Sequence, residues 1–183
     1  GGHYIMTNFI QIPNEFFEGE NKLTPEELYV WSYLQSRVLR WEDKILINID
    51  MVSQELQLVK TKKINKQKLK EIIVLLHNKE VIRLNKEVNE NMKYDDLLKL
   101  DYINVGEEYT GFEKISFEYF NIVKTLEEKE RAITFAILCY IKKNSYKEGK
   151  ISYIEWVEFL NVSDKTVQNK LMEMANLGLI TIE

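Results

Sequence analysis

Residues 59–70 carry a dense cluster of positive charge. This stretch contains no acidic residue, and its six lysines are Lys60, Lys62, Lys63, Lys66, Lys68 and Lys70. Lysine ammonium groups attract phosphate through charge alone, so such a cluster can bind a polyanion with little regard to its sequence and with a steep dependence on salt. The segment therefore predicts phosphate contacts, although the whole chain has a net charge of −4.

An ordinary solvated surface is the alternative explanation for these lysines. Of the 25 basic residues in the chain, only Arg37, Arg40, Arg83 and Arg131 are arginines, so lysine runs are less surprising here than in most proteins. Arginine is the usual bidentate reader of guanine. Arg83 precedes a long polar stretch, and it is the arginine that we expect to reach a groove or a phosphate backbone.

A second polar set lies near the carboxyl end of the chain. The set occupies positions that we expect to be exposed early in a helix, and its members are Lys165, Thr166, Gln168, Asn169 and Lys170. Glutamine and asparagine amides can pair with the edge of adenine in the major groove. We expect this second set to supply sequence preference and the lysine run to supply phosphate contacts. The alternative is the surface of an ordinary soluble helix.

Residue types that support catalysis are scarce. The seven glycines form no phosphate-binding loop, because neither the G-x-G-x-x-G nor the G-x-x-x-x-G-K spacing occurs. Gly1-Gly2-His3 has the pattern of a cleaved expression tag, which leaves His77 and Cys139 as too few ligands for a zinc site. We therefore expect no enzymatic activity, no cofactor and no metal. Residues 133–141, the longest apolar run, are about half of a membrane span, and no signal peptide pattern is present, so we expect a cytoplasmic protein without membrane contact.

An internal repeat organises the elements that must position these residues. Residues 9–17 return as residues 112–120, and each copy is followed by the pattern of an amphipathic helix. Residues 47–56 align with 151–160, and each copy predicts a short strand that runs into a short helix. A second amphipathic helix then ends in a short strand, at residues 81–82 in the first copy and 179–180 in the second.

This order of elements is the order of a winged helix-turn-helix. The sequence therefore predicts a mainly α fold with small β-hairpins, built as two tandem winged helix-turn-helix domains over residues 1–105 and 106–183. The boundary is expected near residues 106–111. In the second copy Ser163 and Gly178 are expected to cap a helix over 164–177, and the full wing is expected to be missing, as in a fragment of a longer protein.

The first copy differs from the second in two segments. Six extra residues, 59–64, separate its two helix-turn-helix helices and include the first three lysines. A long polar wing also follows residue 84 and ends in a predicted return strand over residues 97–103. A helix that begins near Asn65 would direct Leu69, Ile72, Ile73 and Leu76 inward. The same placement leaves Lys66, Lys68 and Lys70 around the outer side.

Residues 9–17, followed by residues 23–28 and an aromatic-rich helix, resemble the amino-terminal winged helix of RepA-type plasmid replication initiators and DnaD-like phage replisome organisers. The resemblance covers about the first 85 residues and implies binding to repeated sites in double-stranded DNA at an origin. It also implies a homodimer and recruitment of replisome proteins. The chain departs from that pattern through its second winged helix and its enlarged turn.

Three functions are compatible with these features. The first is DNA binding as a replication initiator or organiser of a plasmid, phage or other mobile element. The second is a transcriptional regulator of the same fold. The third is a protein interaction module that binds no DNA, which the charges support: residues 1–105 carry 15 basic and 16 acidic residues, and residues 106–183 carry 10 and 13. Many DNA-binding domains are strongly basic.

Overall fold

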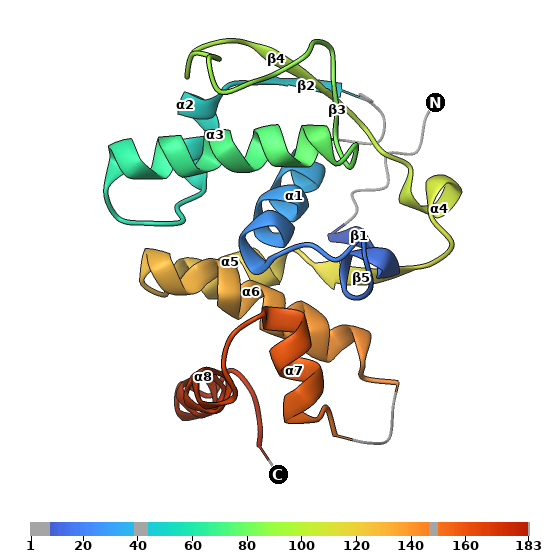
Figure 1. Ribbon diagram of the computed structural model, residues 1–183, viewed down its shortest axis with the longest axis vertical. Helices are drawn as coiled ribbons and strands as arrows, with labels where there is room; N and C mark the ends of the chain where they lie inside the picture. Colours follow the sequence, from blue (N-terminus) through green and yellow to red (C-terminus); the bar gives the residue numbers. More distant parts are fainter. Residues whose placement is uncertain (1–7, 39–43, 147–149, 183) are drawn as a thin grey trace.

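The computed structural model describes residues 8–38, 44–146 and 150–182, so the expected tag residues 1–3 lie outside it. Helices dominate a mixed α/β fold with small antiparallel sheets (Figure 1). The first half contains β1 (Phe9–Pro13), η1 (Asn14–Phe16), α1 (Pro25–Arg37), β2 (Lys44–Ile47), α2 (Ile49–Glu55), α3 (Lys62–Asn78), β3 (Arg83–Leu84), β4 (Leu98–Asp101) and α4 (Val105–Glu108). The second half contains β5 (Phe112–Ser116), α5 (Glu118–Lys124), α6 (Glu128–Lys143), α7 (Tyr153–Leu160) and α8 (Asp164–Asn176).

The first half folds around α1. Thr24 and Glu27 form a reciprocal capping box at the start of this helix, and Pro25 occupies its first turn. Strands β2, β4 and β3 form an antiparallel sheet in that order. In Figure 1 this sheet lies on one side of α3, and α1 lies on the other side, between α3 and α6. Helix α1 is therefore packed against neighbours from both halves of the chain.

The two repeats meet through the paired strands β1 and β5. Phe9 lies opposite Ser116 and Pro13 lies opposite Phe112, with Gln11 opposite Lys114 at the centre of the antiparallel pair. Phe9 and Phe112 are equivalent in the repeat and are 103 residues apart. If each residue is replaced by its equivalent in the other repeat, the pair Phe9–Ser116 becomes the pair Phe112–Pro13. The central pair, Gln11 and Lys114, stays the same pair. The two strands are therefore related by an approximate twofold axis through the centre of the pair.

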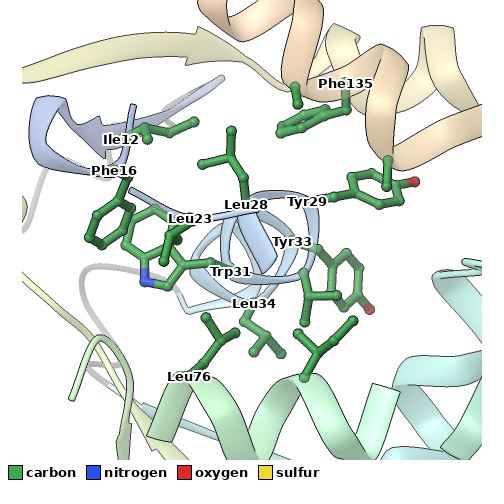
Figure 2. Close-up of a cluster of buried hydrophobic side chains, with 14 of the residues drawn as sticks. Ile12, Phe16, Leu23, Leu28, Tyr29, Trp31, Tyr33, Leu34, Leu76 and Phe135 are labelled. Carbon is green, nitrogen blue, oxygen red and sulfur yellow. The ribbon is translucent and has the colours of Figure 1, made fainter. Parts of the chain in front are cut away.

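One hydrophobic core extends across both repeats. The ring of Phe135 in α6 lies 5.2 Å from the ring of Tyr29 in α1 and 4.9 Å from that of Phe120 in α5. In Figure 2, Tyr29 lies on the side of α1 that faces Phe135, whereas Leu34 points toward Leu76 on the opposite side. Side chains of the two repeats thus pack together in one core.

The predicted helix near the carboxyl end is confirmed as α8. The Ser163 side chain accepts a hydrogen bond from the backbone N–H of Thr166, and Asp164 lies at the positive end of the helix dipole. Gly178 has a φ of +75°, a left-handed conformation that glycine adopts with little strain after a helix. Ser163 and Gly178 therefore determine where α8 begins and ends.

Other predicted elements need correction. Residues 151–152 and 179–182 form no strand, because no described segment of the second repeat lies beside them as a hydrogen-bonding partner. In the first repeat the strand after α3 begins at Arg83, two residues later than predicted, while Val81 and Ile82 are buried against the core. Of the six extra residues, 62–64 form the first turn of α3 rather than part of a loop.

Candidate nucleic-acid interface

The turn between α2 and α3 is held in place by a buried asparagine. The Asn65 side-chain oxygen accepts a hydrogen bond from the backbone N–H of Leu58 at 2.7 Å, and its nitrogen donates to the Leu56 carbonyl at 3.0 Å. Both leucines are buried, so the start of the turn, just after α2, is also anchored by apolar contacts. The lysines that follow Leu58 therefore project from a fixed backbone.

Lys60, Lys62 and Lys63 gather at the amino-terminal end of α3. All three are exposed, and none has an ion-pair partner within 4.0 Å among the described residues. Lys62 is the first residue of the helix, and the first turn contains no acidic residue. The partial positive charge of the helix end thus adds to that of the lysines. This end of the helix is suited to bind an anion.

The other three lysines of the run are half-buried and have partners within the protein. The ammonium group of Lys66 lies 2.8 Å from the Asp50 carboxylate, and that of Lys68 lies 3.6 Å from Glu26. Lys70 donates hydrogen bonds to the backbone carbonyls of Glu90 at 2.7 Å and Met92 at 3.2 Å. The predicted inward face of α3 is confirmed, since Leu69, Ile73 and Leu76 are buried.

Arg83 is also engaged within the protein. It belongs to β3, and its guanidinium group lies 2.7 Å from the carboxylate of Glu108 in α4. The side chain is about half exposed, so this is a surface ion pair that contributes little to stability. Arg83 could bind a phosphate only if its ion pair with Glu108 were broken first.

Four of the five predicted residues in α8 are exposed: Lys165, Thr166, Gln168 and Asn169. The amide nitrogen of Gln168 donates to Asp164 one turn earlier at 3.3 Å, and the Thr166 hydroxyl lies 2.8 Å from that of Ser163. These short-range contacts leave the polar face of the helix open to solvent.

The prediction that Lys170 is exposed was wrong. Its side chain is 7% exposed, and its ammonium group lies 2.7 Å from Glu130 of α6 and 3.8 Å from Glu173. Lys170 follows Val167 by three positions and precedes Met174 by four, which places it on the buried face of the helix. This spacing was visible in the sequence, but the partner on α6 is 40 residues away and was not.

No protein-family model, curated protein or solved structure matches this chain. The assignment of the surface therefore rests on its geometry and charge. None of the helices in the described ranges is both long enough and apolar enough to cross a membrane. Within the same ranges, no three His, Cys, Asp or Glu side chains are grouped closely enough to hold a metal ion. Burial raises the pKa of the Cys139 thiol well above its ordinary value, which keeps this thiol protonated and unreactive.

Sequence reasoning missed the side chains of α6 that lie beside the lysine turn. A cleft next to the turn is lined by Val59, Lys60, Glu127, Glu128 and Lys129. Arg131 of the same helix donates a hydrogen bond to the Gln57 side chain at 2.7 Å. The second repeat therefore supports the basic turn of the first and contributes acidic groups to one side of it.

The pairing of Lys170 with Glu130 predicts a specific pattern of stability. Glu130→Gln should lower the free energy of unfolding by about 1 to 3 kcal/mol, because it leaves a buried ammonium group without its nearest carboxylate. Lys170→Met, which removes the charge and keeps the packing, should stay within about 1 kcal/mol of wild type, since apolar replacements of buried ion pairs are often tolerated. Urea denaturation of both variants and of the double variant provides the test. Equal stability of Glu130→Gln and wild type would contradict the role of the pair.

Proposed function

We propose that this chain binds double-stranded DNA through two winged helix-turn-helix units, with the lysine turn of the first unit contacting phosphate. The observation that carries the proposal is the group formed by Lys60, Lys62 and Lys63, which are exposed at the amino-terminal end of α3 and have no ion-pair partner within 4.0 Å in the described part of the chain. Charges left unpaired on a fixed backbone favour a polyanion over a small neutral ligand.

The arrangement of elements supports the winged-helix part of the proposal. In the first half, α1, β2, α2 and α3 are followed by the hairpin of β3 and β4, and β4 lies between β2 and β3. In a helix-turn-helix the second helix of the pair enters the major groove, which assigns this role to α3 and, in the second repeat, to α8. In this proposal α3 and α8 engage separate stretches of one duplex.

The biological role that we propose is replication initiation or organisation on a plasmid, phage or other mobile element. This part rests on the resemblance of residues 9–28 to replication initiators and replisome organisers. A transcriptional regulator would use the same DNA chemistry. Selection of bound duplexes from a random pool distinguishes the two roles, because the enriched sites belong either to an origin or to promoters. Homodimerisation and binding of replisome proteins belong to the same proposal.

A protein interaction module is the second candidate function, and the charge of the second repeat favours it. On α7 and α8 the exposed charged groups are Glu158, Asp164, Glu173 and the single cation Lys165. Lys170 is neutralised by Glu130. This surface repels phosphate more than it attracts it, so the second unit is better suited to a protein partner than the first.

The proposal is tested by neutralising the lysine turn. Lys60, Lys62 and Lys63 are changed together to glutamine, and binding to a labelled duplex is followed by fluorescence anisotropy between about 50 and about 200 mM salt. Each lost phosphate contact should lower the slope of log affinity against log salt by about 0.9, so the triple variant should flatten it by about 2 to 3. The melting temperature should not change, since these side chains are exposed.

A matched triple variant controls for net charge. Lys44, Lys114 and Lys124 are exposed lysines on β2, β5 and α5, and their change to glutamine removes the same total charge. This variant should retain a slope close to that of wild type. Equal effects of the two triple variants would show that net charge alone governs binding. Absence of duplex binding by wild type at low salt would overturn the DNA proposal and favour the interaction module.

A further inference from the structure

The connection between β3 and β4 runs back along α3. We call residues 85–97 the strap; Figure 1 shows this connection on the same side of α3 as the three-stranded sheet. Near its start, the Glu87 carboxylate lies 3.1 Å from the His77 ring near the end of α3. Near its end, the hydroxyl of Tyr94 donates to the Gln67 side chain at 3.1 Å. The strap is therefore antiparallel to the helix.

The contacts of the strap fall along one stripe of α3. Lys66, Lys70 and His77 are separated by four and seven positions, a spacing that places side chains on one helix face. With a rise of about 1.5 Å per residue, the stripe extends over about 16 Å. The strap thus covers most of one side of the helix that the proposed function assigns to the DNA groove.

Apolar and polar contacts together hold the strap in place. Val88 and Met92 are buried, and the Tyr94 carbonyl accepts a hydrogen bond from the backbone N–H of Asp50 at 3.1 Å. The ring of Tyr94 lies beneath two ammonium groups, 6.0 Å from that of Lys66 and 5.2 Å from that of Lys70. Cations within about 6 Å of an aromatic face are attracted to it, so Tyr94, together with Asp50, holds these ammonium groups against the protein.

The charge of the strap opposes that of the helix face. Its four acidic residues are Glu87, Glu90, Asp95 and Asp96, against Lys86 and Lys93. The strap carbonyls of Glu90 and Met92 also accept hydrogen bonds from Lys70. A polyanion that approached this face would meet the acidic groups of the strap before it could reach the lysines.

We propose that the strap is an autoinhibitory cover that competes with DNA phosphate for Lys66 and Lys70. The inference rests on the proposed function and adds a regulated step to it. Binding of a duplex displaces Tyr94 from the two ammonium groups and replaces Asp50 as the ion-pair partner of Lys66, so that both lysines then contact phosphate. A protein or ligand that held the strap closed would weaken DNA binding without touching the lysine turn.

The test uses Tyr94→Ala in the full chain, with Tyr94→Phe as the matched control that keeps the ring over the lysines. Tyr94→Ala should bind a duplex of about two helical turns several-fold more tightly at low salt. Its slope of log affinity against log salt should match that of wild type, since the same phosphate contacts form in both complexes once the strap is displaced. Tyr94→Phe should resemble wild type. Unchanged or weaker binding by Tyr94→Ala would overturn the inference.

Amide hydrogen exchange shows whether the strap moves when DNA binds, and it therefore tests this inference independently of the proposed function. When wild type binds the duplex, the amides of residues 85–97 should exchange faster than in the free protein, because the strap is displaced. Binding with unchanged or slower exchange in the strap would overturn the inference and leave the proposed function standing. If wild type binds no duplex at any salt concentration, the proposed function fails and the inference fails with it.

Discussion

Phe135→Ala is expected to lower the free energy of unfolding by about 3 to 5 kcal/mol and to destabilise both repeats together. Phe135 is fully buried in α6, and its ring contacts Tyr29 of the first repeat and Phe120 of the second. Its removal leaves a cavity lined by both halves, which neither half can close alone. The two repeats should therefore unfold in one cooperative transition.

Two tryptophans allow this cooperativity to be measured. Trp31 is buried in the first repeat and Trp156 in the second, so two single-tryptophan variants, each of which also lacks Trp41, report each half separately. Urea transitions of the two single-tryptophan variants should coincide, both without and with Phe135→Ala. Phe112→Ala is the control, since this half-buried side chain should give a smaller loss. Separate transitions for the two probes would show that each repeat is stable by itself.

Leu171→Ala is expected to destabilise the protein by about 2 to 5 kcal/mol. Leu171 lies on the buried face of α8 between Val167 and Met174, and its truncation leaves a cavity against α7. Met172→Ala is the control on the same helix. The Met172 side chain is 57% exposed, so its truncation should change stability by less than about 0.5 kcal/mol. If Leu171→Ala lowered the free energy of unfolding less than Met172→Ala, then Met172 rather than Leu171 would lie on the buried face of α8.

Short-range signals in the sequence predicted the helices well. Helix α8 begins at the residue after Ser163 and ends shortly before Gly178, because capping depends on residues within one turn. The inward face of α3 followed from the spacing of its apolar residues. Exposure of Lys60, Lys62 and Lys63 was also predicted correctly, since these residues lie outside any apolar spacing.

Long-range contacts could not be predicted in the same way. The return of residues 9–17 as residues 112–120 does not show that β1 pairs with β5, 103 residues away. The acids that neutralise Lys68 and Lys170 also come from distant helices. The strap packs against α3 because Val88 and Met92 are buried. The residues around them in the sequence are polar, so the sequence did not predict this burial.

The pairing of Gln11 with Lys114 at the symmetry axis has a consequence for how this architecture can diverge. In a homodimer with an isologous interface, a residue on the axis meets its own copy, so both sides of the contact must change together. Here the two sides are encoded at separate positions of one gene, and each can mutate without the other. The contact is also intramolecular, so it persists on dilution. One half of such a covalent pseudo-dimer can become basic and the other acidic while their joint core is preserved.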